Sequence, residues 1–270
     1  MKKLFTTVLM GLATLTLVAC GSSKTKEDTS LKDIQDKGKL VVALSPDYAP
    51  FEFKTLVDGK DTIVGADVEI AKAIADKLGV ELELSPMSFN NVLASLVSKK
   101  ADIAISGISA TEERAKNFDF SDVYYNAKNI VLIKKENMGK YTSASSLADR
   151  AVGAQKGSIQ EPIVTEQLPD SHLVSLMQIT EMVTELNSGK LDAIVMEETI
   201  AKGYVANNEE LAIAEIPLKE DAGEPGSAVA MAKGSESLKK VIDEVIGELK
   251  SSGEIDTFVQ EAYELSLSAE

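Results

Sequence analysis

Residues 67–105 read DVEIAKAIADKLGVELELSPMSFNNVLASLVSKKADIAI, and this stretch decides the fold class. Over 67–78 its apolar positions recur every three or four residues, which predicts an amphipathic helix ending at Gly79. The elements around it are an apolar strand over 40–44, a strand over 81–84, a helix over 89–98 and a strand over 103–105. Strands that alternate with helices in this way predict an α/β fold, with a mostly parallel sheet flanked by helices.

A second series of strands and helices follows along the chain. Its predicted strands are 130–133, 151–154, 173–176, 193–195, 211–216 and 228–232, and its predicted helices are 159–167, 180–187, 198–206, 236–250 and 254–265. Lys100-Ala-Asp102 and Lys190-Leu-Asp192 each follow a helix and open a strand. This echo indicates two sheets of similar construction, although common helix-to-strand turn chemistry explains it equally well. The length suits either one large domain or two lobes of about 100 residues each.

The N-terminus is predicted to be an export signal. Met1-Lys2-Lys3 is basic, and residues 4–18 are uncharged and apolar but too few for a comfortable membrane span. Leu17-Val18-Ala19-Cys20 then resembles a bacterial lipobox, in which cleavage precedes a cysteine that receives diacylglycerol. We therefore expect a signal peptide over 1–19 and a lipidated, flexible tether over 20–30. The alternative is an ordinary signal peptide that contains a cysteine by chance.

Composition excludes several classes of function. The formal net charge is −15, and after removal of residues 1–19 the balance is 26 basic against 43 acidic side chains, or −17. Such an acidic body argues against nucleic acid and against electrostatic adhesion to anionic lipid. Cys20 is the one cysteine and His172 the one histidine. We expect no transition metal, no Ser-His-Asp triad and no cofactor, and nucleotide-binding motifs are missing from the sequence.

Polar residues end several of the predicted strands. They are Ser45, Ser106, Gly107, Gln155 and Glu197. In open α/β sheets ligands bind beyond the carboxyl ends of the strands. Two sheets with such rims facing each other would form a binding cleft.

One of these rims continues into SGISATEERAKNFDFS, residues 106–121, which contains Arg114. Ser109-Ala-Thr-Glu112 fits the S-x-x-E capping box of a helix start. On this local interpretation, Arg114 is a surface residue in the first turns of the helix.

A set of ordered motifs resembles the bacterial extracellular solute-binding proteins of family 3, the polar amino acid receptors of ABC importers. The motifs lie between about Leu31 and Leu265: PDYAPFEF at 46–53, GAD at 65–67, SGISATEER at 106–114, FDFSDVYY at 118–125, QKGS at 155–158 and LDA at 191–193, running to Glu197. The resemblance implies a two-lobed, periplasmic-binding-protein-like (type II) fold with two crossing hinge segments. It places one lobe at 31–126 plus 220–270 and the other at 127–219.

The resemblance also implies a set of ligand contacts. Arg114, with the Ser109 hydroxyl, would grip the α-carboxylate of an amino acid, because a guanidinium offers it two parallel donors. Glu197, with the Gly107 carbonyl, would receive the α-ammonium. Tyr48 and Phe89 would sandwich the ligand side chain.

The second lobe would contribute further contacts from its own rim. Ser158 lies at a strand-to-helix turn whose free N–H groups can meet the carboxylate, and Gln155 and Gln160 are candidates from the same rim. Ser45 departs from the family pattern, because many members have an aspartate there that binds the distal end of the ligand side chain. Asp47 or Glu52 would have to substitute.

We therefore expect a non-enzymatic, monomeric receptor, anchored by lipid outside the membrane of a Gram-positive bacterium. It would deliver a free L-amino acid to an ABC permease and its ATPase. The paired aromatic rings and the acidic body favour arginine or histidine, with glutamine as the competitor. The alternatives are a cleft enzyme of the cyclohexadienyl or arogenate dehydratase type, and a sensor module for a signalling partner.

Overall fold

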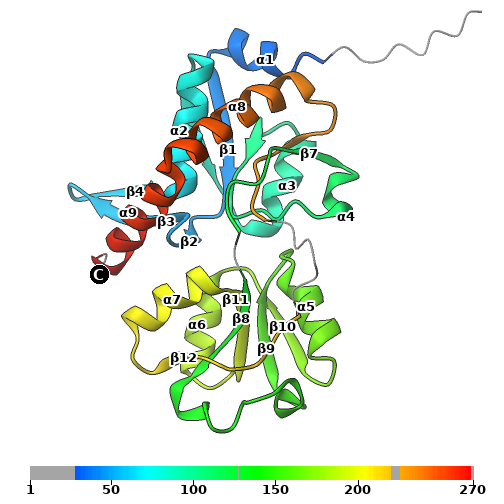
Figure 1. The fold of residues 1–270 in the computed structure, drawn as a ribbon, viewed down its shortest axis with the longest axis vertical. Helices are drawn as coiled ribbons and strands as arrows, with labels where there is room; N and C mark the ends of the chain where they lie inside the picture. Colours follow the sequence, from blue (N-terminus) through cyan, green and yellow to red (C-terminus); the bar gives the residue numbers. More distant parts are fainter. Residues whose placement is uncertain (1–27, 127, 220–225, 269–270) are drawn as a thin grey trace, which may run out of the picture.

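The computed structural model describes residues 28–126, 128–219 and 226–268. The described residues form two lobes, each built on a five-stranded sheet (Figure 1). The first-lobe sheet has the order β5-β1-β6-β13-β7. Its strands are β1 (Lys39–Leu44), β5 (Glu81–Pro86), β6 (Ile103–Ala104), β7 (Phe118–Phe120) and β13 (Ala230–Ala232).

The second-lobe sheet has the order β10-β9-β11-β8-β12. Its strands are β8 (Asn129–Lys134), β9 (Ala151–Gln155), β10 (His172–Leu176), β11 (Ala193–Glu197) and β12 (Leu211–Ile213). A separate small sheet in the first lobe has the order β2-β3-β4, from β2 (Asp47–Tyr48), β3 (Glu52–Val57) and β4 (Lys60–Val64).

Both large sheets are mostly parallel, as the sequence predicts, with one reversed strand each. In the first sheet β5, β1 and β6 are parallel, while β13 is antiparallel to β6 and β7. In the second, β10, β9 and β11 are parallel, while β8 is antiparallel to β11 and β12. Each reversed strand is the first that the chain forms after crossing from the other lobe. It therefore enters its sheet from the side that faces the partner lobe.

Helices cover both sheets. In the first lobe they are α1 (Ser30–Lys37), α2 (Ala66–Leu78), α3 (Phe89–Val97), α4 (Glu112–Ala115), α8 (Glu236–Ser252) and α9 (Glu254–Ser268). In the second they are α5 (Gln160–Gln167), α6 (Ile179–Asn187) and α7 (Glu198–Asn207), with the 3₁₀ turns η1 (Lys135–Asn137) and η2 (Ala144–Leu147). None of the helices within the described ranges is both long and apolar enough to cross a membrane.

Every strand and helix predicted from the periodicity is confirmed, with ends that agree within three residues. The prediction missed α1, the small β2-β3-β4 sheet, β7 and the 3₁₀ turns η1 and η2, and it did not anticipate that α4 lasts for a single turn. These elements are short or largely exposed, so they carry little periodic apolar signal.

The sequence echo at Lys100 and Lys190 has a structural counterpart. The Asp102 carboxylate accepts a hydrogen bond from Val41 N of β1 at 2.8 Å, and Asp192 accepts one from Ala151 N of β9 at 3.1 Å. In both sheets an aspartate thus joins the helix-to-strand turn to the start of the neighbouring strand. The two sheets share this construction.

The N-terminal signal, Cys20 and the tether up to Glu27 lie outside the described residues. The last three residues of the predicted tether are described, and they contact the start of α8. Asp28 accepts a hydrogen bond from Ser237 N at 2.6 Å, and the Ser30 and Ser237 hydroxyls are 3.2 Å apart. The chain is therefore fixed to the first lobe from residue 28 onward.

The two lobes contact each other directly through polar groups and an apolar cluster. Asp47 accepts a hydrogen bond from Ile179 N at 2.8 Å, and the Tyr125 and Thr199 hydroxyls are 3.0 Å apart. Tyr48 and Phe51 of the first lobe belong to the same buried apolar cluster as Ile179. The lobes are closed against each other in this conformation.

Gly65, the residue just before α2, allows a test of how closely the backbone packs there. It adopts φ +131°, and a Cβ there would lie 2.1 Å from the Phe51 carbonyl oxygen. The matched control is Gly38, which has φ +72° but no atom within 4 Å of a built Cβ. We expect Gly38→Ala to cost about 1–2 kcal/mol in urea unfolding, the usual penalty for this conformation.

The Gly65→Ala variant adds an overpacking penalty of about 1–3 kcal/mol to a backbone penalty of about 1–3 kcal/mol, because φ +131° with ψ 172° is a conformation that essentially only glycine adopts. We therefore expect it to lose about 2–6 kcal/mol. Equal losses for the two variants would show that the approach to Phe51 does not constrain the fold.

Candidate functional site

A small cavity between the lobes brings most of the predicted site residues together. Nine of the eleven line it: Tyr48, Phe89, Gly107, Ser109, Arg114, Gln155, Ser158, Gln160 and Glu197. Ile159, which the sequence analysis missed, completes the lining. The cavity volume is about 10 Å³, comparable to one water. An amino acid therefore enters only when the lobes separate.

The strands and helices explain why these residues meet. Gln155 ends β9, Glu197 ends β11 and Gly107 follows β6, so all three lie beyond the carboxyl ends of strands, as predicted. Phe89 opens α3 and Tyr48 ends β2. Because the two sheets present these ends to each other, residues distant in sequence surround one space.

Arg114 spans the boundary between the lobes. Its guanidinium donates to the Ser109 carbonyl at 2.9 Å and to the Gly157 carbonyl of the other lobe at 3.0 Å. It also lies over the Phe89 ring, 5.9 Å from the centroid. Burial lowers the pKa of Arg114 to about 10, which leaves it charged at neutral pH. A half-buried cation that donates to carbonyl oxygens and lies over an aromatic ring is well suited to bind a carboxylate.

The predicted helix cap at Ser109 is wrong by two residues. The N-cap is Thr111, whose hydroxyl accepts a hydrogen bond from Arg114 N at 3.1 Å, and α4 begins at Glu112. Ser109 instead pairs with Ser227 in an isolated bridge. This pairing holds the Ser109 carbonyl beside the guanidinium, and α4 lasts for one turn only.

Glu197 and Tyr48 form the acidic side of the cavity. Glu197 is 5% exposed and Tyr48 is 8% exposed. Burial, and then the negative charge of Glu197, raises the pKa of Tyr48 well above its usual value. Gly107 has φ +54°, and a Cβ there would lie 2.8 Å from the Tyr48 ring. A larger residue at position 107 would displace the ring.

The second-lobe rim differs from the prediction in one respect. The expected free N–H groups around Ser158 are engaged: Ser158 N donates to the Gln155 carbonyl at 3.1 Å, and Gly157 N donates to the Glu161 carboxylate at 2.7 Å. The turn folds back on itself because Gln155 ends a strand just before α5. Gln160 donates to Asn129 at 2.7 Å, which fixes its amide at the cavity wall.

Ser45 and Ser106 do not line the small cavity. The Ser106 hydroxyl donates to the fully buried Glu52 at 2.5 Å, beneath the site. The Ser45 hydroxyl donates to Asp47 at 2.8 Å. Glu52 is therefore directed into the first lobe, and Asp47 is directed toward the second.

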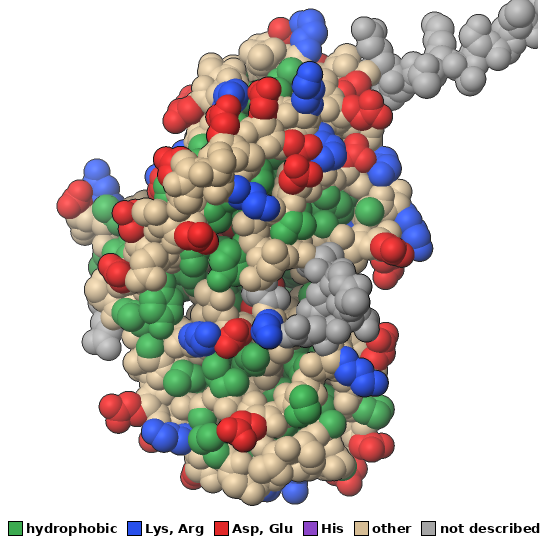
Figure 2. Space-filling model, viewed as in Figure 1, with side chains coloured by type: hydrophobic (Ala, Val, Ile, Leu, Met, Phe, Trp, Pro, Cys, Tyr) green, Lys and Arg blue, Asp and Glu red, His purple; other side chains and the backbone are tan. Residues whose placement is uncertain are grey.

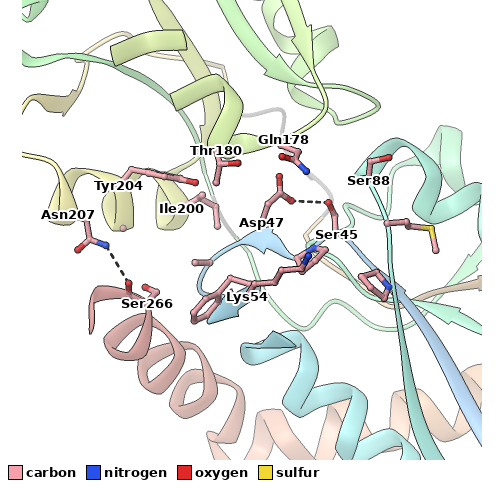
Figure 3. A pocket seen from close by; sticks show the side chains of 16 residues that line it. Ser45, Asp47, Lys54, Ser88, Gln178, Thr180, Ile200, Tyr204, Asn207 and Ser266 are labelled. Carbon is pink, nitrogen blue, oxygen red and sulfur yellow. Dashed lines mark hydrogen bonds between the residues drawn. The ribbon is translucent and has the colours of Figure 1, made fainter. Parts of the chain in front are cut away.

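Asp47 separates the small cavity from a larger groove. Gln155 of the cavity wall approaches it at 3.4 Å, and Asp47 itself lines the groove, whose volume is about 690 Å³. In Figure 3 the Asp47 carboxylate lies at the centre of this groove, between Gln178 and Thr180 on one side and Lys54 on the other. Burial raises the pKa of Asp47 above its ordinary value, since it outweighs the hydrogen bonds from Ile179 N and Ser45.

Acidic side chains elsewhere are spread over the surface. Figure 2 shows Asp and Glu interspersed with Lys and Arg on the visible face, without a single acidic patch. Within the described part of the chain, no three His, Cys, Asp or Glu side chains gather in a way that could hold a metal ion.

Comparison with known proteins identifies the family of this chain. Residues 40–264 match the model of the bacterial extracellular solute-binding proteins, family 3. The arginine-binding extracellular protein ArtP of Bacillus subtilis (strain 168) is 38% identical over 258 residues, covering 95% of this chain and 96% of ArtP. A crystal structure of the amino acid ABC transporter substrate-binding protein AbpA from Streptococcus pneumoniae, bound to L-arginine, is 53% identical. It has a TM-score of 0.85 and covers 87% of this chain and 99% of that chain.

A third similar protein bears on the enzyme alternative. It is the ancestral amino acid-binding protein AncCDT-1, a precursor of cyclohexadienyl dehydratase. It is 30% identical, with a TM-score of 0.77, over 87% of this chain and 99% of that chain. The match over residues 40–264, together with these likenesses, shows that the chain belongs to the bacterial extracellular solute-binding proteins, family 3.

Proposed function

We propose that this protein is the extracytoplasmic receptor of an ABC importer and that its ligand is free L-arginine. One observation carries the proposal: a half-buried cation, a buried acid and a separate half-buried acid border the inter-lobe space. Arg114 lies on one side, Glu197 ends β11, and Asp47 lies at the passage to the groove. A cationic amino acid offers one carboxylate and two positive groups. Each of these groups can pair with a side chain of opposite charge among these three.

Arg114 is assigned to the ligand α-carboxylate and Glu197 to the α-ammonium. The two nitrogens of Arg114 that now donate to the Ser109 and Gly157 carbonyls can donate to two carboxylate oxygens instead. Since Gly157 belongs to the second lobe, opening of the lobes breaks one of these contacts and makes the guanidinium available.

We assign the distal end of the ligand to Asp47, which would take the role of the aspartate that is missing at Ser45. Glu52 is excluded from this role by its contact with Ser106 inside the first lobe. Asp47 already accepts hydrogen bonds from the Ser45 hydroxyl of its own lobe and from Gln155 and Ile179 N of the second lobe. A guanidinium suits the planar carboxylate of Asp47 better than a compact ammonium does, because it offers donors in a rigid fork. Glutamine is the competitor, because an amide can bond Ser45 and Gln155 without any charge.

Closure of the lobes would couple capture to transport. Tyr124 N donates to Ser227 O and Ser227 N donates to Tyr125 O, so the two crossing segments are bonded to each other. These segments are the hinge on which the lobes would open and close. We further propose a monomer with lobes at 31–126 plus 220–270 and 127–219. It presents the closed form to a permease and its ATPase.

An enzyme of the dehydratase type is the second candidate, favoured by the likeness to AncCDT-1. We propose a receptor without enzymatic activity, because the three charged positions are all used by the amino acid. Incubation with prephenate and arogenate tests this alternative, and turnover of either would overturn it. Native mass spectrometry of gently purified protein would identify any retained amino acid.

Arg114→Ala should abolish tight binding. The ligand carboxylate would be buried without its partner, which costs about 3–5 kcal/mol. Calorimetry should therefore show a Kd for arginine raised by about two to three and a half decades. Arg114→Lys should recover little, because the two-donor fork is lost. Arg150→Ala, which removes the other arginine of the sequence, is the matched control. Wild-type affinity in Arg114→Ala would contradict the carboxylate assignment.

Asp47→Asn should weaken arginine more than glutamine. Loss of a charge-assisted hydrogen bond costs about 1.5–3 kcal/mol, or about one to two decades in Kd. The wild-type affinity for arginine should also fall as the pH drops through the raised pKa of Asp47, because the protonated acid carries no charge. In Asp47→Asn this part of the pH dependence should disappear.

A calorimetric screen of all twenty amino acids on ligand-stripped protein sets the ranking, with the exposed Asp61→Asn as the control variant. Glutamine binding at least about tenfold tighter than arginine and histidine, a difference of about 1.4 kcal/mol, would refute the cationic ligand but not the receptor.

We propose that diacylglycerol on Cys20 holds the receptor at the outer face of the membrane of a Gram-positive bacterium. One short acyl chain binds a membrane only marginally, so two chains are needed. Cys20→Ala should leave unprocessed precursor or release protein into the medium. Labelled palmitate on the Cys20→Ala protein would exclude this anchor.

A further inference from the structure

Two carboxyl groups outside the ligand contacts are completely buried under the cavity. Glu52 opens β3 and Asp67 is the second residue of α2, and both are 0% exposed. Nothing in the assignment of the ligand contacts uses them. Burying two carboxyl groups in the same place is costly unless something compensates for their charge.

The hydrogen bonds around these acids fix which of their oxygens are occupied. Ser106 Oγ accepts from Ser45 N at 3.0 Å, so its own proton is donated to Glu52 Oε1 at 2.5 Å. Asp67 Oδ2 accepts from Gly107 N at 2.9 Å and from the Tyr124 hydroxyl at 2.9 Å. One oxygen of each carboxyl is therefore supplied with donors.

The other two carboxyl oxygens lack a hydrogen-bond donor. Glu52 Oε2 and Asp67 Oδ1 are buried and receive no hydrogen bond from any protein group among the described residues. Yet the two carboxyl groups are neighbours, because their partners Ser106 and Gly107 are consecutive and Asp67 N donates to the carbonyl of Phe51, which precedes Glu52. Ionised carboxylates only accept hydrogen bonds, so two of them cannot satisfy each other's oxygens. A hydrogen bond between the two groups requires one additional proton.

We propose that Glu52 and Asp67 share one proton, donated by Glu52 Oε2 to Asp67 Oδ1, and that this pair holds the Ser106–Gly107 loop in position to line the ligand cavity. With this proton, all four carboxyl oxygens are satisfied. Asp67 is the acceptor because two donors already favour its anionic form, whereas Glu52 has only one.

The electrostatic surroundings favour retention of the proton. The titratable groups that act on the pair or its partners are Asp47 and Tyr48 from β2, Tyr124 beside the hinge, and Glu197 from β11. All are acidic or neutral, and no Lys or Arg donates to either carboxyl in the hydrogen bonds and ion pairs of the described ranges. Burial, followed by the charge of Asp67, raises the pKa of Glu52 well above its usual value, and burial raises the pKa of Asp67.

The link to ligand binding runs through the loop. Ser106 contacts Glu52 and Gly107 contacts Asp67, while Gly107 lines the cavity and its Cα lies close to the Tyr48 ring. Only this last step, from the loop to the ligand, rests on the proposed function. The shared proton is testable without any ligand, so failure of the proton and failure of the receptor assignment are distinguishable.

The test compares the wild type with Glu52→Gln, whose amide accepts from Ser106 and donates to Asp67 without titrating. In the unfolded chain both acids ionise near pH 4, about three units below neutrality. Above that pH the native wild type binds one proton more than the unfolded state, so its stability falls as pH rises, until the folded pair titrates. The ratio of unfolding equilibrium constants, wild type over Glu52→Gln, should rise about tenfold per pH unit across this window.

The infrared spectrum at neutral pH gives a readout that a purely structural role would not change. The wild type should show the C=O band of a buried, protonated carboxylic acid, and Glu52→Gln should lack it. The control is Asp119→Asn. Asp119 accepts from Gly234 N and Ser235 N and pairs with Lys233, which lower its pKa.

Asp119→Asn should keep both the acid band and the alkaline slope of the wild type; it should lose a constant amount of stability above about pH 4, and this loss should shrink as the pH falls and the wild-type acid is protonated. A missing band in the wild type, a band that persists in Glu52→Gln, or equal pH slopes for wild type and Glu52→Gln would each overturn the shared proton.

Discussion

A single carboxylate oxygen, Asp67 Oδ2, connects the parts of the molecule that form the site. Through it the start of α2 is bonded to Gly107, beyond β6, and to Tyr124, beside the first crossing segment. The backbone reinforces this junction, because Asp67 N donates to the Phe51 carbonyl at 2.9 Å and so ties α2 to the small sheet. Tyr48, Gly107 and the hinge are thus positioned relative to one fixed point. Displacement of Asp67 would loosen all three.

Charge burial also determines how the lobes meet. Arg114 bonds a carbonyl in each lobe, and Asp47 of the first lobe bonds Ile179 N of the second. Closure therefore removes a cation and an anion from water and compensates them with backbone dipoles. A zwitterionic ligand can replace those dipoles with full opposite charges, which interact more strongly in a low-dielectric site. The same side chains then favour closure and select the ligand.

The sequence was sufficient for the large sheets except β7 and for most of the cavity lining, and insufficient for side-chain direction. Gln155 and Glu197 could be found because they end strands that belong to a regular apolar pattern. Asp47 and Glu52 could not be told apart, because β2 has two residues and its pairing with β3 decides which way each carboxyl points. The helix cap was misplaced because Ser109 and Thr111 both suit the role, and the bridge to Ser227 is a tertiary contact.

The acidic surface and the acidic site act over different ranges. Asp and Glu side chains are spread over the visible face (Figure 2), so the body attracts cations generally. At physiological salt this attraction is screened over about 8 Å, and it does not distinguish arginine from lysine. Discrimination must therefore come from groups that are shielded from solvent. Asp47, which is close to Ser45, Gln155 and Ile179, meets that condition, and its carboxylate can recognise the shape of a guanidinium as well as its charge.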